Sequence, residues 1–561
     1  MTNLGTIAGG SGRFGVLSTS SGGAGIALQT AGGAITNRGL VEGGDGSYGL
    51  HGLGLSGGDG GAALVAGAAV QVINRGTLRG GAGGPGSFGD SYYDYNNNIF
   101  SPGFGGEGGR GGAGARLSAG GRLTNFGDVI GGAGGDGASG AQYGGSGGDG
   151  AAGVRLTAGG YVLNEGVIQS GHGGVGQYYN YHGRQGHGGN GGAGVNLVAG
   201  GTLINRGTIE GAMGGAGGVS GGMSNPAGAA GAGVYAGPGG AATVTNAGTI
   251  AGPVDSVLFT SVADVLIAEA GARFVGAVVG GGGTFALSGG TGAISGLGGA
   301  GQVSGAVSAT VFGFGSYVIG AGGRWSLSGT NALGSGQSLT VDGLLAVDGA
   351  LTEAADATID IGAGGELRFV RVDDILAGPV VNDGLLSVRD GALTVTGAVG
   401  GAGAAVINFG TLAFGAAFSE DVTFARRSGK LRLGQSQNYS GVISGFAADS
   451  HDILDLCDIA FVGAGEASFS GTASGGVLTV GDGTHTAKVS LTGDYLGDTF
   501  TVSSDGSGGV DIVATGAGPP AVHAFTTAMA GLGGANATAL ASRVPRVEDQ
   551  PSLVSPRGAW V

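Results

Sequence analysis

Two short stretches of this chain are rich in tyrosine and carry the residue types best suited to recognising another molecule. They run from Ser91 to Phe100 and from Gln177 to His182, and asparagines accompany the tyrosines in both. Tyrosine offers rigid amphipathic area, and asparagine offers adaptable hydrogen bonds. We therefore predict contact with a sugar or a partner protein here; the alternative is that the rings only cover the glycine-rich loops. The tyrosines concerned are Tyr92, Tyr93, Tyr95, Tyr178, Tyr179 and Tyr181.

Three histidines and two glycine-aspartate motifs contain metal-binding residue types, but their spacing does not favour a metal site. His172, His182 and His187 lie 10 and 5 residues apart, which is not a strict ligand spacing. Residues 131–136 and 144–149 match the first six places of a calcium-binding nonapeptide. In each motif, however, alanine stands where the large apolar residue is expected. The sequence predicts neither a bound metal nor a cofactor.

Tight groups of acidic residues, which glycosidic-bond cleavage requires, are rare in this chain. Asp373–Asp374 and the set Asp452, Asp455 and Asp458 are the two candidates, and we interpret both as solvated turns. The sequence contains no nucleophile elbow and no phosphate-binding loop. We therefore predict that the protein is not an enzyme. A carbohydrate-active β-helix enzyme, either a polysaccharide lyase or a hydrolase, is the alternative.

The composition excludes several classes of protein. Glycine supplies 142 of the 561 residues, whereas its usual share is roughly 7%. Hydrophobic residues make up 41% and charged residues 11%, which is unlike the composition of a disordered chain. The net charge is −15, and Lys430 and Lys488 are the only lysines, so nucleic-acid binding is not expected. The single cysteine, Cys457, excludes an intramolecular disulfide, and no apolar run is long enough to predict a membrane-spanning helix.

A phrase of the form Asn-x-Gly followed by an apolar pair recurs along the first 250 residues. Successive copies lie 34 to 51 residues apart, a period typical of solenoids. In residues 153–168 a strand, a Gly-Gly turn, a second strand, the Asn-x-Gly turn and a third strand follow one another. Three short strands joined by tight turns predict one coil of a right-handed parallel β-helix, so the fold class is all-β.

The asparagine of the phrase is predicted to have a structural role. Asparagine tolerates left-handed turn geometry, and its amide can bond to the local backbone. Identical side chains stacked from coil to coil can also bond to one another, as in amide ladders. After Asn3, the predicted turn asparagines are Asn37, Asn74, Asn125, Asn164, Asn205 and Asn246.

Glycine-rich excursions of period three separate the copies of the phrase. Residues 105–113 and 188–193 show the pattern most clearly. Glycine at two places of every three permits close-packed extended helices of the polyproline II type. Flexible surface loops are the other interpretation, and the sequence leaves both open.

Changes in composition divide the chain into four parts. Residues 1–252 are predicted to be β-helix with Asn-x-Gly repeats and glycine-rich excursions, and residues 253–438 a continued β-helix with shorter turns. Residues 439–516 are predicted to be a C-terminal β module that caps the last coil, because an open end would expose unpaired strand edges. Residues 517–561 are predicted to be a mostly disordered tail.

The Asn-x-Gly-[Thr/Val]-Ile units with their Gly-Gly turns resemble passenger regions of bacterial autotransporters and related glycine-rich, adhesin-like surface proteins. The resemblance covers residues 1–250 well and 251–440 loosely. It implies a secreted or cell-surface protein of a Gram-negative bacterium that acts in adhesion, with glycans or surface proteins as partners. A purely structural surface-layer component is a further alternative.

The sequence departs from this family in two respects. Passengers are preceded by a signal peptide and followed by an outer-membrane β-barrel, whereas residues 2–7 already form a repeat and no barrel fits after Val513. We expect either an excised passenger or a protein exported by other secretion machinery.

Overall fold

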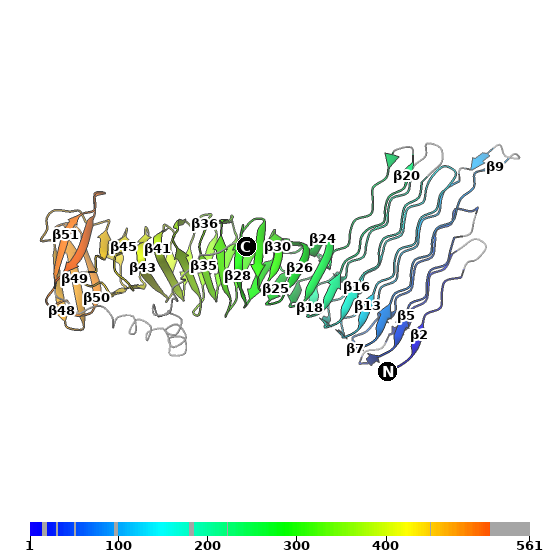
Figure 1. Cartoon of the computed structure of the whole chain (residues 1–561), viewed down its shortest axis with the longest axis horizontal. Coiled ribbons are helices and arrows are strands. Elements are labelled where there is room, and N and C mark those ends of the chain that lie inside the picture. The colour runs from blue at the N-terminus through cyan, green and yellow to red at the C-terminus, as the bar shows by residue number, and fades with distance from the viewer. Residues whose placement is uncertain are drawn as a thin grey trace, which may run out of the picture. The chain divides into compact units, whose positions relative to one another are not determined.

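The computed structural model describes residues 1–13, 19–29, 32–49, 52–94, 99–101, 103–178, 185–220, 223–448 and 450–516, so the predicted tail lies outside the described residues. These residues are nearly all-β and form long parallel sheets, which confirms the predicted β-helix (Figure 1). The chain divides into two compact units, Met1–Ile359 and Asp360–Val561. Each unit is described separately below.

The first coils of the first unit stack three rows of short strands. In each row the apolar residues that alternate with polar ones point inward, as in Leu123, Val162 and Leu203, which are fully buried. One row ends on the asparagines and holds β1 (Thr2–Asn3), β4 (Ala34–Asn37), β7 (Gln71–Asn74), β12 (Arg122–Asn125), β15 (Tyr161–Asn164), β18 (Gly201–Asn205) and β23 (Ala242–Asn246). The row after the Asn-x-Gly turn holds β2 (Thr6–Ala8), β5 (Leu40–Glu42), β8 (Thr77–Arg79), β13 (Asp128–Ile130), β16 (Val167–Gln169) and β19 (Thr208–Glu210). The row after each excursion holds β3 (Ile26–Leu28), β6 (Leu64–Ala66), β11 (Ala115–Leu117), β14 (Val154–Leu156), β17 (Val195–Leu197) and β22 (Val234–Ala236).

The asparagines of the phrase form a continuous ladder of amide side chains through the coils. Asn125 Nδ2 donates to Asn164 Oδ1 at 2.8 Å, and Asn164 Nδ2 donates to Asn205 Oδ1 at the same distance. Asn164 Nδ2 also bonds to the carbonyl of Gly166 in its own turn and to that of Thr208 in the next coil. The same 2.8 Å side-chain bond links every consecutive pair from Asn3 to Asn246.

The ladder stops at Asn246 because the next coil has no asparagine in register. Ala268 takes that place. Asn246 Oδ1 still accepts hydrogen bonds from Asn205 Nδ2 and Gly248 N, but its buried Nδ2 has no partner among the described residues.

The glycine-rich excursions are ordered arrays of extended runs (Figure 1). The fourth excursion has an outgoing run, residues 131–138, and a returning run, residues 144–152, and backbone hydrogen bonds repeat along both every three residues. Gly134 N donates to His172 O of the next outgoing run at 2.8 Å, and Gly135 N donates to Gly109 O of a returning run at 2.8 Å. Outgoing and returning runs therefore form two layers, bonded within each layer and between the layers.

Glycine is required at two places of every three because neighbouring runs leave no room for a side chain. A Cβ on Gly135 would lie 2.1 Å from Gly84 O, and one on Gly132 would lie 1.9 Å from Gly81 O. The third residue of each triplet is exposed, as at Asp136, or half-buried, as at Asp149; we call this the outward position. Of the two interpretations of the excursions, the described residues show ordered close packing of the runs.

The excursions end at β24 (Thr249–Phe259), where the chain continues directly from one row of strands into another. Its first residues pair with β19, and Val257–Phe259 pair with β22, the strand that follows the sixth excursion. Two short hairpins lie within excursions: β9 (Tyr92–Asp94) with β10 (Ile99–Ser101), and β20 (Val219–Ser220) with β21 (Met223–Ser224). The later strands of this unit are β25 (Val265–Glu269), β26 (Arg273–Val279), β27 (Thr284–Ser288), β28 (Thr291–Ser295), β29 (Gly301–Gly305), β30 (Ser308–Phe312), β31 (Ser316–Ile319), β32 (Arg324–Ser328), β33 (Thr330–Leu333), β34 (Ser338–Val341), β35 (Leu344–Val347) and β36 (Ala350–Glu353), with β37 (Thr358–Ile361) at the division.

The second unit consists of parallel coils followed by an antiparallel cap. Its coils contain β38 (Glu366–Val370), β39 (Asp373–Leu376), β40 (Val380–Asn382), β41 (Leu385–Val395), β42 (Val399–Gly400), β43 (Ala404–Phe414), β44 (Asp421–Phe424), β45 (Gly429–Leu433), the short 3-10 helix η1 (Ser436–Asn438), β46 (Val442–Ser444) and β47 (Ile453–Leu456). The cap contains β48 (Ala467–Thr472), β49 (Gly475–Gly481), β50 (Thr486–Thr492), β51 (Thr499–Ser504) and β52 (Val510–Thr515). Because β50 pairs with β46 and β52 with β47, the cap covers the strand edges of the last coil.

One corner of the second unit holds residues other than glycine in left-handed backbone conformation in successive coils. Arg371, Asp390 and Phe409 have φ of 56° or 57°, and Ser428 and His451 follow with 65° and 61°. Strand pairing on both sides fixes the register, so Asp390 and Phe409 occupy equivalent places in adjacent coils. Each such residue is strained by about 1 kcal/mol relative to glycine.

We predict that Gly135→Ala opens the fourth excursion. Its Cβ would clash with Gly84 O, and overpacking of this kind destabilises by about 1–3 kcal/mol. Hydrogen–deuterium exchange should show faster exchange of the amides of residues 131–153. Ala133→Ser, at an outward position of the same run, is the matched control and should leave protection unchanged. Equal protection in both variants would contradict the close packing of the runs.

We predict that Asn164→Ala lowers the free energy of unfolding by about 2–4 kcal/mol, because it breaks the ladder in the middle and leaves a buried cavity. Asn246→Ala is the matched control at the end of the ladder, where the amide donor is already unpartnered. Its thermal unfolding midpoint should fall less. If the two variants unfold at the same temperature, continuity of the ladder contributes nothing.

Candidate binding surface

The distal parts of the glycine layers carry exposed apolar side chains at outward positions. Tyr48 is 68% exposed, Phe104 is 53% exposed and Tyr178 is 46% exposed. Each belongs to a different excursion, and its flanking backbone bonds to neighbouring runs. Rings exposed to this extent on a rigid backbone are typical of interaction surfaces. Further exposed apolar residues of the excursions are Leu53, Val175, Met213 and Val219.

Phe104 and Tyr143 form a stacked pair at the start of two adjacent returning runs. Their ring centroids are 4.8 Å apart with an interplanar angle of 8°. Gly105 N donates to Tyr143 O at 2.7 Å and so fixes the register of the two runs. A Cβ on Gly140 would lie 2.2 Å from Gly105 N, so the backbone beneath the rings is closely packed. The pair forms a flat apolar platform on an ordered support.

The structure places only part of the predicted tyrosine site. Tyr92 and Tyr93 lie in β9, which pairs with β10, and Tyr178 lies at the distal end of the fifth outgoing run. Tyr95, Tyr179 and Tyr181 lie outside the described residues. Sequence reasoning missed Tyr48, Phe104 and Tyr143. The signal that would have found them is an aromatic residue at the third place of a glycine triplet.

The candidate metal ligands serve other roles or lie apart. His172 belongs to the outgoing run and His187 to the returning run of the fifth excursion, and His182 lies outside the described residues. Asp136 Oδ1 accepts a hydrogen bond from Val175 N at 2.7 Å, and Asp149 Oδ1 accepts one from Asn190 N at 2.9 Å. These carboxylates therefore join successive runs within a layer. Among the described residues, no three His, Cys, Asp or Glu side chains are grouped to hold a metal ion.

The acidic residues considered for catalysis do not converge. Asp373 accepts a hydrogen bond from Ala392 N, Asp452 accepts one from Gly429 N, and Asp458 accepts bonds from Ser436. Asp374, Asp452 and Asp455 are buried, so the prediction of solvated turns is wrong for these three. For Asp452 and Asp455 burial was not evident because their partners Gly429 and Lys430 come from another coil.

Asp455 is the buried member of an ionic cluster that joins the last coil to the cap. Lys430 Nζ lies 2.8 Å from Asp455 Oδ2 and 3.0 Å from Asp511 Oδ1, and Arg432 Nε lies 3.6 Å from Asp455 Oδ2. Burial disfavours the charged form of Lys430, but the two carboxylates outweigh this effect and raise its pKa. Arg432 Nε also donates to Cys457 Sγ at 2.9 Å. The cluster links β45, β47 and β52, which indicates a structural role.

Glu420 is a buried carboxyl group with an altered pKa. It is 5% exposed, and its Oε2 accepts a hydrogen bond from Asn382 Nδ2 at 2.6 Å. Burial raises the pKa of Glu420 to about 7; the bond from Asn382 lowers it, and the charges of Asp383 and Asp421 raise it further. Asn382 Nδ2 also donates to Ala404 O in the next coil. The Glu420 carboxyl group therefore accepts a hydrogen bond from an amide that links two coils.

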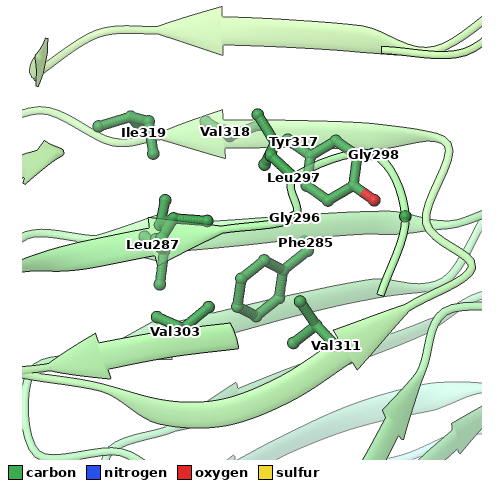
Figure 2. Close-up of a pocket in the computed structure, with 12 residues that line it drawn as sticks. Phe285, Leu287, Gly296, Leu297, Gly298, Val303, Val311, Tyr317, Val318 and Ile319 are labelled. Atoms are coloured by element: carbon green, nitrogen blue, oxygen red, sulfur yellow. The ribbon is translucent and has the colours of Figure 1, made fainter. Parts of the chain in front are cut away.

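The hollows found in the first unit offer no catalytic chemistry. Figure 2 shows a pocket lined by apolar side chains that include Phe285, Leu287 and Tyr317. Its volume of about 10 Å³ is room for one water molecule at most. A shallower groove of about 330 Å³ is lined by residues that include Phe274, Gln302 and Thr310, with no titratable side chain in its lining.

No protein-family model, no curated protein and no solved structure matches this chain. Within the described part of the chain, no helix has the length and apolar character needed to cross a membrane.

We predict that Glu420 makes the protein less stable as the pH rises from about 4.5 to about 7. Its pKa is higher in the folded state than in the unfolded state, so folding favours the protonated form. The stability is fully present below pH 4.5, declines by up to roughly 3 kcal/mol, and is constant above pH 7. Glu420→Gln keeps the acceptor for Asn382 and should remove this slope. Parallel curves of unfolding free energy against pH for the two proteins would contradict the assignment.

Proposed function

We propose that the protein is a non-enzymatic, extracellular or cell-surface adhesin whose glycine layers display aromatic side chains to glycans. The observation that carries the proposal is the stacked Phe104–Tyr143 pair, in which Phe104 is exposed and Tyr143 is partly exposed, on a closely packed backbone. Flat aromatic surfaces bind the apolar faces of sugar rings, and Tyr143 adds a hydroxyl for their polar edges.

The ordered support strengthens this proposal. Binding orders flexible side chains and loops, which reduces affinity, whereas a preorganised surface avoids that loss. In the glycine layers, backbone hydrogen bonds at two places of every three restrain each run, and acidic side chains such as Asp136 bond to the third. Only the outward side chains differ freely from coil to coil, so recognition can change without altering the layers.

The resemblance to autotransporter passengers supports the same function, since such regions act in adhesion at the surface of Gram-negative bacteria. Among the acidic candidates for the alternative of a carbohydrate-active enzyme, Asp455 meets a second carboxylate, that of Asp511, but both are paired with Lys430. A purely structural surface-layer component would not need exposed rings such as Tyr48 and Phe104.

The test is a glycan array with the full-length protein, followed by affinity measurement on the glycans that bind. We expect the double variant Phe104→Ser/Tyr143→Ser to reduce affinity by about tenfold or more, which corresponds to about 1.4 kcal/mol. Val262→Ser removes an exposed apolar side chain outside the excursions and is the matched control.

Three outcomes would contradict the proposal. Affinity that survives the double variant would remove the aromatic pair as the site. Absence of binding to any glycan would favour a purely structural role. Release of new reducing or unsaturated ends from a bound polysaccharide would favour the enzyme.

A further inference from the structure

The strained corner of the second unit contains an insertion of two arginines. Two residues separate Ile407 from Gly410. In the next coil their register partners are Phe424 and Gly429, and four residues separate these. Ala425 N bonds to Ile407 O, and Ser428 adopts the left-handed conformation of Phe409 in the coil before. The additional residues are therefore Arg426 and Arg427.

These arginines extend a row of exposed cationic side chains along the corner. Arg371 and Arg389 lie at the same corner three and two coils earlier, where Arg371 N donates to Arg389 O, and Phe409 occupies the coil between Arg389 and the insertion. Among the described residues, Arg371, Arg426 and Arg427 have no ion pair, and Arg389 has one long contact of 3.9 Å with Asp390. With coils about 4.8 Å apart, the row spans about 14 Å.

The left-handed conformation indicates that the side chains at this corner have a role that glycine could not fill. Glycine adopts this conformation without strain and is abundant in the chain, yet Arg371, Asp390 and Phe409 occupy three equivalent places. Strain of this kind gathers at functional sites. Phe409 is also 40% exposed, so burial does not explain the choice of a large aromatic residue.

We propose that the corner formed by Arg371, Arg389, Asp390, Phe409, Arg426 and Arg427 binds a strand of acidic polysaccharide. The arginines would pair with its carboxylate or sulfate groups, which are the anions that the guanidinium fork matches. Phe409 would contact the apolar face of a sugar ring, and the Asp390 carboxylate would accept hydrogen bonds from sugar hydroxyls.

The surrounding charge favours a thin polymer with separated charges over other anions. The whole chain carries a net charge of −15, and Asp373 and Asp390 lie close to the arginines. Nucleic acid and anionic membranes present dense negative charge over a wide area, which such a protein repels. A single polysaccharide strand meets only the corner, and it alternates anionic groups with the hydroxyls that Asp390 can bind.

The experiment measures binding of the full-length protein to labelled oligogalacturonate and to dextran sulfate, with neutral dextran as the uncharged comparison. Arg426→Gln/Arg427→Gln should weaken binding by about tenfold or more. Arg116→Gln/Arg155→Gln removes two exposed, register-paired arginines of the first unit and is the matched control for charge. Its affinity should stay within about twofold of the unaltered protein.

Phe409→Gly separates binding from folding. Removing the strained side chain should raise the melting temperature, while loss of the ring should weaken oligosaccharide binding several-fold. Because the variant is expected to be more stable, weaker binding cannot be attributed to unfolding. Unchanged binding by Phe409→Gly would overturn the role of the ring.

Further outcomes would overturn the proposal as a whole. They are absence of binding to both acidic polymers, equal binding of neutral dextran, and equal weakening by the control double variant. Tighter binding to polyglutamate or to phosphatidylserine vesicles than to both polysaccharides would identify an acidic protein segment or a membrane as the ligand instead. The Phe104→Ser/Tyr143→Ser variant should bind these polymers normally, so this test is independent of the proposed glycan site.

Discussion

The hydrogen bonds between equivalent backbone groups of successive coils are the constraint on which the first unit depends. They hold Asn125, Asn164 and Asn205 close enough for their amides to bond directly at 2.8 Å. They also bring the extended runs of the excursions so close that a Cβ on Gly132 would overlap a neighbouring carbonyl. The runs of the excursions keep the spacing of the β-solenoid but have no apolar core of their own. The high glycine content is a consequence of this close packing.

This constraint explains why the composition changes near residue 250 although the coils continue. In β24 a single strand joins the rows that the excursions separate in earlier coils, so no extended runs remain to be packed. Glycine triplets are then unnecessary, and large residues such as Phe259 and Phe274 fill the core. The asparagine ladder ends at the same place, because Ala268 follows Asn246 in register.

The parts of the structure that could be predicted are those that repeat. The strands and the Asn-x-Gly turn were visible because every coil contains them, and the period-three glycines allowed ordered packing but did not require it. The aromatic platform of Phe104 and Tyr143 was not predicted. Finding it requires knowing, in two different runs, which residue takes the third place of each glycine triplet. The burial of Asp455 was missed for a similar reason: its partners Lys430 and Asp511 lie far away in the sequence and meet only when the cap covers the last coil.

A backbone fixed in this way leaves few places where side chains can change. Outward positions of the glycine layers lie at the surface, where they can present rings such as Phe104. The strained corner also accommodates side chains, because strand pairing on both sides holds Asp390 and Phe409 in conformations they would not adopt alone. In both places a rigid backbone supports exposed groups of varied chemistry. That arrangement suits the recognition of extended ligands.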